Sequence, residues 1–342
     1  MAYPSEAELR SRVHIISASR RTDIPAFYAR WFLNRIRAGF CHWVNPFGGQ
    51  VYRVSLRPED CAVIVFWTRN VRPLLPHLRE LHNRGYRFYF HYTINGYPRK
   101  LDPRCPSPSA AVDTVKRLAD LIGPELVLWR YDPVVISRLT PVSFHLENFE
   151  RLSSALEGAT RRCYTSFVDL YRKTGRNLCQ LEKTTQQVES PRRPYKQEQR
   201  ELLLAFAETA GRHGISLYVC CDDIPPEATV PELTLDTRPR PNTAPPIHRA
   251  RCVDPVLVRQ LRPDLSPALE PRPTRPGCGC VRSVDIGAYD TCLFGCLYCY
   301  ANSSLRVALA HYRSHNSEDT ILYRPPRLQG IDLDLVAKNL VG

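Results

Sequence analysis

The sequence contains no run of about eighteen apolar residues, the length that a helix needs to cross a bilayer. Its first residues, Met1-Ala-Tyr-Pro-Ser-Glu, lack the basic and then apolar pattern of a secretory signal. We therefore expect no membrane segment and a cytoplasmic location. Disulfides are rare in the cytoplasm, so its thiols are expected to be free.

Lysine is scarce, with 6 Lys against 41 Arg in 342 residues, and the net charge is +13. An arginine excess suits nucleic-acid or phosphate partners. It equally suits a codon bias of the source genome, with which the 30 prolines agree. No basic block with interleaved aromatic residues stands out. Nucleic acid therefore stays a possible partner that composition alone does not select.

Regular alternation of apolar β-rich runs and amphipathic helical patterns covers residues 13 to 220. Strands are expected near residues 13–17, 62–67, 86–94, 125–130, 162–168, 215–220 and 281–289, with 51–56 as an eighth candidate. Helices are expected at 24–38, 71–84, 109–122, 142–157, 196–213 and 303–313. Repeated β–α units predict a parallel sheet covered by helices. The strand count favours an open or nearly closed parallel (β/α) barrel of the TIM-barrel type.

Three segments follow from this pattern. Residues 1–223 form the barrel body, and residues 224–277 form a connector whose thirteen prolines disfavour helix and central strand. Residues 278–342 form a cysteine-rich segment that completes the barrel and ends in an irregular tail. The chain is thus expected to be an α/β protein with a Pro-rich, Cys-bearing C-terminal extension.

The 13 cysteines are unevenly placed. Five are scattered and are interpreted as small buried apolar residues: Cys41, Cys61, Cys105, Cys163 and Cys179. The other eight all lie at or beyond position 220, which indicates metal binding. Cys292, Cys296 and Cys299 follow the spacing Cys-x3-Cys-x2-Cys. Since a four-iron, four-sulfur cluster is usually held by four cysteines, three in one loop leave an iron free for another ligand.

This loop, with Tyr298 before its third cysteine, resembles the signature of the radical S-adenosylmethionine superfamily. The resemblance implies a 4Fe-4S cluster whose free iron binds S-adenosylmethionine, with Tyr298 among the cofactor-binding residues. It also implies reductive cleavage of the cofactor, a deoxyadenosyl radical that abstracts hydrogen, and an electron donor such as a ferredoxin or flavodoxin. In most members the cysteine loop follows the first strand, whereas here it follows the last. The arrangement resembles a circular permutation and predicts that the first and last strands are neighbours.

The wider chain resembles an uncharacterised bacterial domain-of-unknown-function family. The resemblance is carried by the segments 17–25 (SASRRTDIP), 129–133 (WRYDP), 167–172 (FVDLYR) and 277–280 (GCGC) running on to Asn302. It implies an iron–sulfur, radical-type protein and names no substrate.

The remaining cysteines predict a second metal site. Cys278, Cys280 and Cys252, with one of the adjacent Cys220 and Cys221, offer four thiolates for either an auxiliary 4Fe-4S cluster or a zinc ion. We select Cys220, because it continues a strand toward the carboxyl edge and Cys221 is expected to point away.

Polar residues follow several predicted strands, where the active sites of βα barrels lie. The loop containing Ser17, Ser19, Arg20, Arg21 and Asp23 precedes a helix and suits an anion such as a cofactor carboxylate, although Asp23 is also a natural helix cap.

Arg130 and Asp132 end another strand, and alternation aims them at one side. Either they grip a cofactor or substrate, or they form a buried structural pair. Asp169 follows a further strand as a weaker catalytic candidate with an equally natural turn role.

Two functions follow from these patterns. The first is a radical S-adenosylmethionine enzyme that acts on a small or nucleotide-like substrate. The alternative is a nucleic-acid-binding protein stapled by zinc or an iron–sulfur cluster, with no catalysis. A carrier that only moves electrons is disfavoured, because a carrier needs no large α/β body with polar strand ends.

Overall fold

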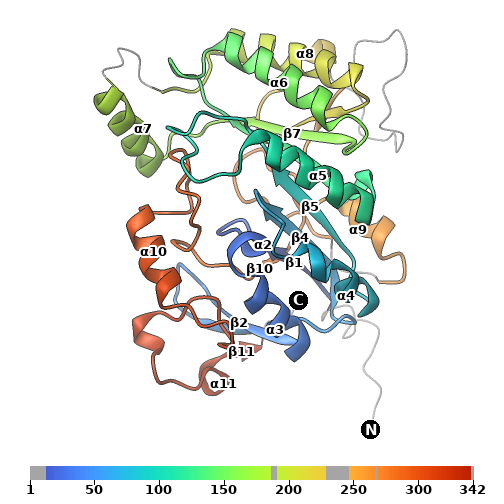
Figure 1. Cartoon of the computed structure of the whole chain (residues 1–342). Coiled ribbons are helices and arrows are strands. Elements are labelled where there is room, and N and C mark those ends of the chain that lie inside the picture. Colours follow the sequence, from blue (N-terminus) through green and yellow to red (C-terminus); the bar gives the residue numbers. More distant parts are fainter. Residues whose placement is uncertain (1–12, 186–190, 229–245, 266–268, 340–342) are drawn as a thin grey trace.

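The main body of the protein is an eight-stranded, entirely parallel sheet (Figure 1). The computed structural model describes residues 13–185, 191–228, 246–265 and 269–339. Across the sheet the strand order is β10 (Val284–Asp285), β1 (His14–Ala18), β4 (Cys61–Thr68), β5 (Phe88–Thr93), β6 (Val127–Val134), β7 (Arg162–Phe167), β8 (Ser216–Val219) and β9 (Ile247–Arg249). The prediction that the first and last strands are neighbours is confirmed, since Ser17 of β1 pairs with Asp285 of β10.

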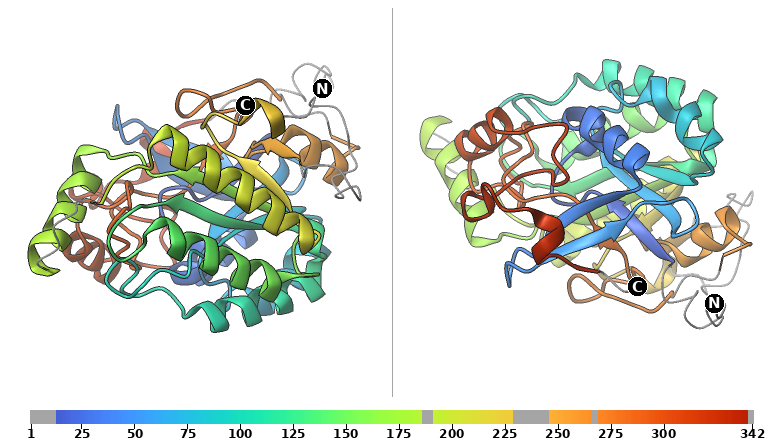
Figure 2. Two further views of the ribbon diagram at one scale, coloured as in Figure 1. Left: turned by 90° about the horizontal axis from the view of Figure 1, so that it is seen from above. Right: turned by 90° about the horizontal axis from the view of Figure 1, so that it is seen from below.

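Side-chain alternation divides the sheet between two apolar clusters. On one face, residues such as Ile64, Phe90 and Trp129 pack with the helices. These helices are α2 (Ile24–Phe27), α3 (Ala29–Ala38), α4 (Leu78–Asn83), α5 (Pro108–Ile122), α6 (Val142–Leu156) and α8 (Lys196–Arg212), and Figure 2 shows α6 and α8 layered over the sheet. On the other face, Val65 and Tyr164 pack with the chain around Cys252 and with α9 (Pro255–Leu261).

Local sequence signals account for where several helices begin and end. Ser107 accepts a hydrogen bond from the Ala110 N–H at the start of α5, and Pro108 occupies the first turn, where its missing N–H costs nothing. Gly39 ends α3 in the left-handed conformation, which glycine adopts without steric cost. These helices therefore begin and end close to where the sequence predicts.

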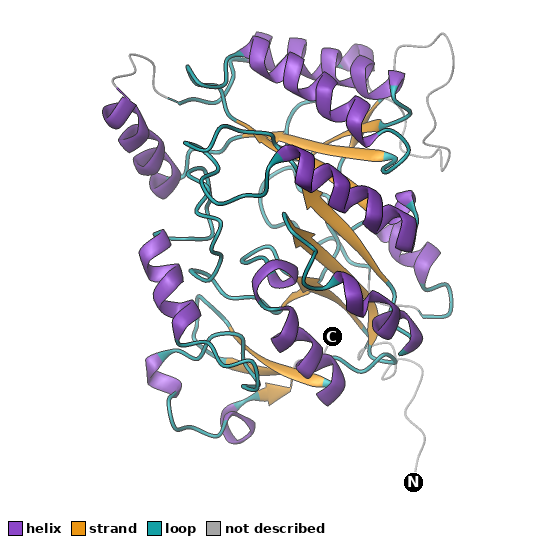
Figure 3. Cartoon of the chain, in the orientation of Figure 1, coloured by secondary structure: helices purple, strands orange, loops and turns teal. Residues whose placement is uncertain are grey.

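A second, three-stranded sheet lies beside the first, with the strand order β11 (Lys338–Asn339), β3 (Val51–Ser55) and β2 (Phe40–Val44). Residues 51–56 therefore belong to this smaller sheet, and β9 is the eighth strand of the large one. The expected irregular tail is partly wrong, because β11 pairs with β3 and α11 (Leu333–Val336) packs nearby. Figure 3 shows long loops on the side where α7 (Arg172–Thr185) and α10 (Leu305–Arg313) lie.

The structure decides between the open and the nearly closed form that the sequence predicts, and it corrects one further expectation. The large sheet is open over the described residues, since β9 and β10 are its edges and no pairing joins them. The connector is not devoid of regular structure, because β9 extends the sheet as an edge strand and α9 begins with Pro255 at its first position, where proline is tolerated. Residues 229–245 and 266–268 of the connector lie outside the described residues.

The predicted strand 281–289 is only Val284–Asp285, and the helix expected over 24–38 is two helices divided at Tyr28. No helix in the described part of the chain is long and apolar enough to cross a membrane.

Candidate metal centres

The Cys292–Cys299 loop begins a few residues after β10, at the edge of the sheet next to β1. Two contacts tie it to distant parts of the chain. The Tyr28 hydroxyl donates to the Thr291 carbonyl oxygen at 2.7 Å, and the Leu297 N–H donates to the Leu101 carbonyl oxygen at 3.1 Å. Within the loop, the Cys299 N–H donates to the Cys296 carbonyl oxygen at 3.1 Å, which closes a turn between the second and third cysteines. The loop is thus a packed element.

Tyr298 anchors this loop through its buried hydroxyl. The hydroxyl donates to Asp102 Oδ1 at 2.6 Å and accepts from Arg69 at 2.7 Å and from Asn95 at 3.0 Å. Arg69 also forms an ion pair with Asp102 at 3.1 Å, with both side chains largely buried. The predicted cofactor-binding role of Tyr298 is untested, and its hydroxyl is already fully engaged by the protein.

A fourth thiol lies beside the loop. Cys105 Sγ is 3.6 Å from Cys296 Sγ and accepts from Arg69 at 3.5 Å. Among the described residues, Asp102, Cys105 and Cys296 form the one group of three potential metal ligands whose atoms all lie within 4.8 Å of one another. A cavity of about 240 Å³ is lined by Cys105, Asp102 and Arg69. Cys105 is buried, as predicted, but its contacts with Cys296 and Arg69 give it more than a packing role.

The loop thiols resist ionisation where they lie. Burial raises the pKa of Cys292 and of Cys299, and the contact with Cys105, together with burial, raises the pKa of Cys296. A thiolate is the form that binds metal, so three thiolates in this place need a compensating cation. A bound metal or cluster supplies that charge.

The predicted anion-binding loop already holds an anion that belongs to the protein. Ser17 and Ser19 donate through their hydroxyls to the two oxygens of Asp285, each at 2.7 Å. The Arg20 N–H donates to Asp285 Oδ2 at 2.8 Å, and the Arg21 N–H donates to Ser19 Oγ at 2.9 Å. A cofactor carboxylate bound to the same hydroxyl and N–H groups would have to displace Asp285. The cofactor-binding role of this loop therefore stays a prediction.

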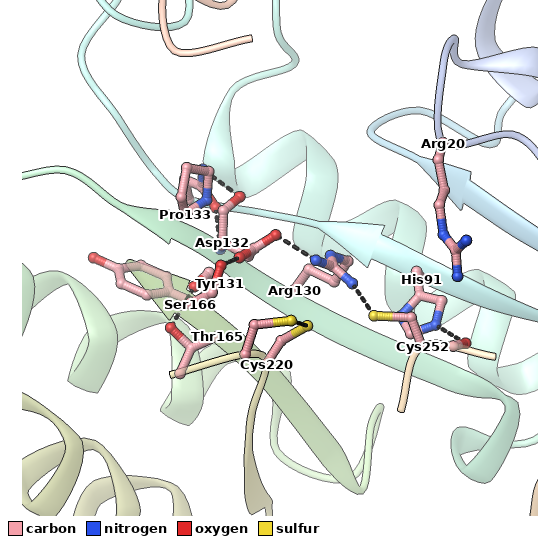
Figure 4. Close-up of polar contacts among 12 residues, drawn as sticks. Arg20, His91, Arg130, Tyr131, Asp132, Pro133, Thr165, Ser166, Cys220 and Cys252 are labelled. Atoms are coloured by element: carbon pink, nitrogen blue, oxygen red, sulfur yellow. Dashed lines mark hydrogen bonds and ion pairs between the residues drawn. The ribbon is translucent and has the colours of Figure 1, made fainter. Parts of the chain in front are cut away.

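Arg20 and Arg21 point to different surroundings. Arg21 lies against the rings of Trp43 and Tyr289, with its guanidinium carbon 5.3 Å from each centroid. The Arg20 guanidinium lies over Trp67 at 5.0 Å, and its NH2 atom is buried without a hydrogen-bond partner. Figure 4 shows Arg20 directed toward His91 and Cys252.

Asp23 serves as the helix cap that the sequence offers as its alternative role. Its carboxylate accepts from the Ala26 N–H at 2.9 Å, from the Thr68 hydroxyl at 2.8 Å and from the Arg69 N–H at 2.6 Å. Burial nevertheless raises the pKa of Asp23 to about 7. These bonds join the start of α2 to the end of β4. Asp23 therefore has a structural role.

The second set of cysteines is brought together by the fold, as predicted. Cys220, Cys252 and Cys280 lie in one buried cluster with Cys221 and Cys278 packed against it, and Cys252 interacts with Cys220 and Cys280 while Cys278 interacts with Cys280 and Cys221. Cys220 and Cys221 complete the circle, with their Sγ atoms 3.6 Å apart. These five residues form a closed ring of thiols, here called the thiol ring. The expectation that Cys221 points away is wrong, because its positive φ of 64° turns it back toward its neighbour.

Contacts between neighbouring thiols shift their pKa values in opposite directions. They lower the pKa of Cys252 and of Cys278, and they raise the pKa of Cys220 and of Cys280. The thiols of the ring therefore influence one another's ionisation.

Arg130 and Asp132 lie on one side of β6, as alternation predicts, and Arg130 reaches the thiol ring. Arg130 donates to Asp132 and, at 3.1 Å, to Cys252 Sγ, while the Ser166 hydroxyl donates to Asp132 (Figure 4). His91 Nε2 lies 2.8 Å from the Cys252 carbonyl oxygen, and its buried Nδ1 has no partner. The structure shows a largely buried Arg130–Asp132 ion pair. Binding of a cofactor or substrate by this pair stays a prediction.

Asp169 is bound between two arginines. It pairs with Arg193 at 3.0 Å and with Arg275, and all three residues line a cleft of about 490 Å³ together with Cys221 and Asp222. Its carboxylate is about one-third exposed, so it remains accessible from the cleft. Its predicted catalytic role is untested.

Sequence reasoning missed three participants: Cys105, Cys221 and Asp285. Cys105 lies in a loop after β5 that carries no metal-binding spacing. Cys221 stands beside Cys220, so adjacency was the available signal for it. Asp285 carries no such signal, because it meets Ser17 only through the pairing of β10 with β1. The side chain of Cys179 lies outside the described residues.

The fold and its thiols define an α/β protein with two cysteine-rich sites on one parallel sheet. A family model described as a domain of unknown function, DUF1848, matches residues 15–301. The chain therefore belongs to this family, as the sequence predicts. A comparison with curated proteins gave no match.

Proposed function

We propose that the chain is an iron–sulfur enzyme of the radical S-adenosylmethionine type, acting on a small or nucleotide-like substrate. One observation carries the proposal: Cys292, Cys296 and Cys299 share a packed loop that leaves the sheet edge at β10, beside β1. This adjacency supports a permuted relative of the superfamily, in which the loop occupies the place that follows the first strand. It also supports the finer assignment of the sheet as an opened barrel of the TIM-barrel type.

The residues present fit a 4Fe-4S cluster. Cys292, Cys296 and Cys299 would hold it, because these three partly exposed thiols have raised pKa values and need a cationic partner to ionise. When bound and reduced, such a cluster supplies the electron that cleaves S-adenosylmethionine and yields a radical able to abstract hydrogen.

The chain's own residues position the loop. Tyr298 and Asp102 fix its centre, and the buried guanidinium of Arg69 places a positive charge next to Cys296. Asp285 joins β10 to the loop after β1 through the hydroxyls of Ser17 and Ser19. These contacts define a rigid frame, which precise positioning of a reactive centre requires.

A second candidate function is favoured by Cys105. If Cys105 supplies a fourth thiolate, the loop cluster has no free iron and can only carry electrons. The distance of 3.6 Å between the Sγ atoms of Cys105 and Cys296 supports this alternative function.

The test is reductive cleavage of S-adenosylmethionine by anaerobically reconstituted protein. We expect the wild type to release methionine and 5′-deoxyadenosine, and Cys296→Ala to lose both products and the loop cluster. Cys61→Ala is the control, because Cys61 is a free thiol that lies at the start of β4 outside both sites. A wild-type protein that holds iron but releases neither product would overturn the proposal in favour of the carrier.

A further inference from the structure

The thiol ring gathers residues from three separate parts of the chain. Cys220 and Cys221 follow β8, Cys252 follows β9, and Cys278 and Cys280 lie before β10. Cys220, Cys252 and Cys280 are buried, whereas Cys221 and Cys278 are partly exposed. Five free thiols that converge from distant segments are not needed to fill an apolar core. They indicate a ligand that prefers sulfur.

The spacing of these sulfur atoms argues against a single zinc ion. Tetrahedral zinc with Zn–S bonds of about 2.3 Å holds every pair of its four sulfurs about 3.8 Å apart. Although all five thiols of the ring lie in the described part of the chain, no three of them come within 4.8 Å of one another. The Cys220 and Cys221 sulfurs lie 3.6 Å apart, but the five thiols together are spread more widely than the ligands of one small ion. Such a spread suits a cluster of several metal atoms.

Hydrogen-bond donors surround the thiol ring. Arg130 donates to Cys252 Sγ at 3.1 Å, Arg275 to Cys220 Sγ at 3.9 Å, and the Val253 N–H to Cys280 Sγ at 3.4 Å. Donors to sulfur are among the features by which proteins tune iron–sulfur clusters. Two guanidinium groups at the sulfurs also match the net negative charge of a cluster with four thiolates.

Arg20 adds a third cation near the ring. Its guanidinium interacts electrostatically with Cys252 and Cys280, and its buried NH2 atom has no hydrogen-bond partner. Because a buried cationic donor without a partner is costly, this atom points to an acceptor that is absent from the protein itself. A cluster at the ring would supply acceptor sulfurs near it.

Cys221 is the member of the ring that differs from the others. It adopts a left-handed φ of 64°, which is unfavourable for a residue with a side chain. A methyl group at Gly277 would lie 3.3 Å from Cys221 Cα, so the chain before Cys278 packs directly on this residue. Cys221 also lines the cleft of about 490 Å³. It is therefore a partly exposed thiol of the ring that faces the cleft, where the Arg275 side chain also lies.

We infer that the thiol ring binds a second iron–sulfur cluster, held by Cys220, Cys252, Cys278 and Cys280, with Cys221 as a spare thiol facing the cleft. This site is independent of the Cys292–Cys299 loop and of any catalysis there.

The deciding experiment uses the full chain with Cys292, Cys296 and Cys299 all replaced by alanine. After anaerobic reconstitution, iron, zinc and acid-labile sulfide are counted, and the visible and electron paramagnetic resonance spectra are recorded. We expect at least about two irons per chain with equal sulfide, which is the smallest iron–sulfur cluster held by four cysteines. One zinc without sulfide, or no bound metal, would overturn the inference.

Two further variants test the ligand assignment. Cys252→Ser in the otherwise wild-type chain should lose the iron of the thiol ring and keep that of the loop. Cys221→Ser should keep both, because the hydroxyl occupies the space of a thiol that is not a ligand. If Cys221→Ser loses the cluster and Cys220→Ser keeps it, the assignment of these two is reversed and the proposed ligand set is wrong.

The result is separable from the proposed function. If the triple-alanine chain no longer cleaves S-adenosylmethionine but keeps the iron–sulfur spectrum of the thiol ring, both proposals are supported. Failure of the wild type to cleave the cofactor would leave the iron count of the thiol ring unaffected.

Discussion

The Sγ atoms of Cys105 and Cys296 lie 3.6 Å apart although 191 positions separate the two residues. Asp102 completes a group in which each of the three potential ligand atoms lies within 4.8 Å of the others. Whether Cys105 is a metal ligand would distinguish an open from a closed coordination sphere at the Cys292–Cys299 loop, and so the proposed enzyme from an electron carrier.

Replacing Cys105 with alanine distinguishes these two functions. If the loop holds its cluster through three thiolates, Cys105→Ala should keep the loop's iron and still cleave S-adenosylmethionine, because no ligand is removed. Iron content and product release are measured side by side with Cys296→Ala, which should lose both. Loss of iron in Cys105→Ala would mean that Cys105 is the fourth ligand.

The Tyr298 hydroxyl should contribute measurably to stability. Tyr298→Phe removes one donor to Asp102 and an acceptor for Arg69 and Asn95. Leaving buried polar partners unsatisfied costs about 1–3 kcal/mol in the free energy of unfolding. Urea denaturation of metal-free protein measures this cost.

Tyr312→Phe is the control, because its side chain is 40% exposed. Such surface changes usually alter stability by less than about 0.5 kcal/mol. Equal stability of the two variants would show that the network does not hold the loop.

Gly287 should not tolerate a side chain. An added Cβ there would lie 2.0 Å from Ser19 Oγ and 2.6 Å from Ser19 Cβ. Overpacking of this kind costs about 1–3 kcal/mol, so Gly287→Ala should lower the midpoint of urea denaturation. At Gly48 the nearest neighbour of an added Cβ is 3.9 Å away, so Gly48→Ala should change the midpoint much less. Comparable midpoints would contradict the close approach of Gly287 to Ser19.

His145 should make stability depend on pH. Burial lowers its pKa from 6.5 to about 4, and it lies 2.9 Å from the Tyr131 hydroxyl and 3.0 Å from the Val135 carbonyl oxygen. Between pH 6.5 and pH 4 the unfolded chain binds more protons at His145 than the folded protein does. The contribution of His145 to the free energy of unfolding is therefore complete above pH 6.5 and is lost as the pH falls toward 4. The loss is on the order of 3 kcal/mol.

The check is the free energy of unfolding of the wild type and of His145→Gln from pH 7 to pH 4.5. The wild type should lose more stability on acidification than the variant. His82→Gln, at an exposed histidine, should follow the wild type. Parallel curves for the wild type and His145→Gln would refute this origin of the pH dependence.

Much of the fold follows from local patterns. Apolar runs such as 62–67 and helix stops such as Gly39 predict elements close to those observed, because they depend on neighbours in the chain. The short strand β9 could not be predicted in the same way. Its three residues lie among prolines and become a strand only because the free edge of β8 is available to pair.

The sequence by itself determined which residue types carry the chemistry. The spacing of Cys292, Cys296 and Cys299 defines one site, and the crowding of cysteines beyond position 220 indicates another. Only the tertiary structure decided which residues lie next to these sites. It places Cys105 beside Cys296, Cys221 inside the thiol ring, and Asp285 in the anion-binding loop. Spacing along the chain encodes short-range ligand geometry. Contacts across hundreds of positions depend instead on how helices and strands pack, which no local pattern records.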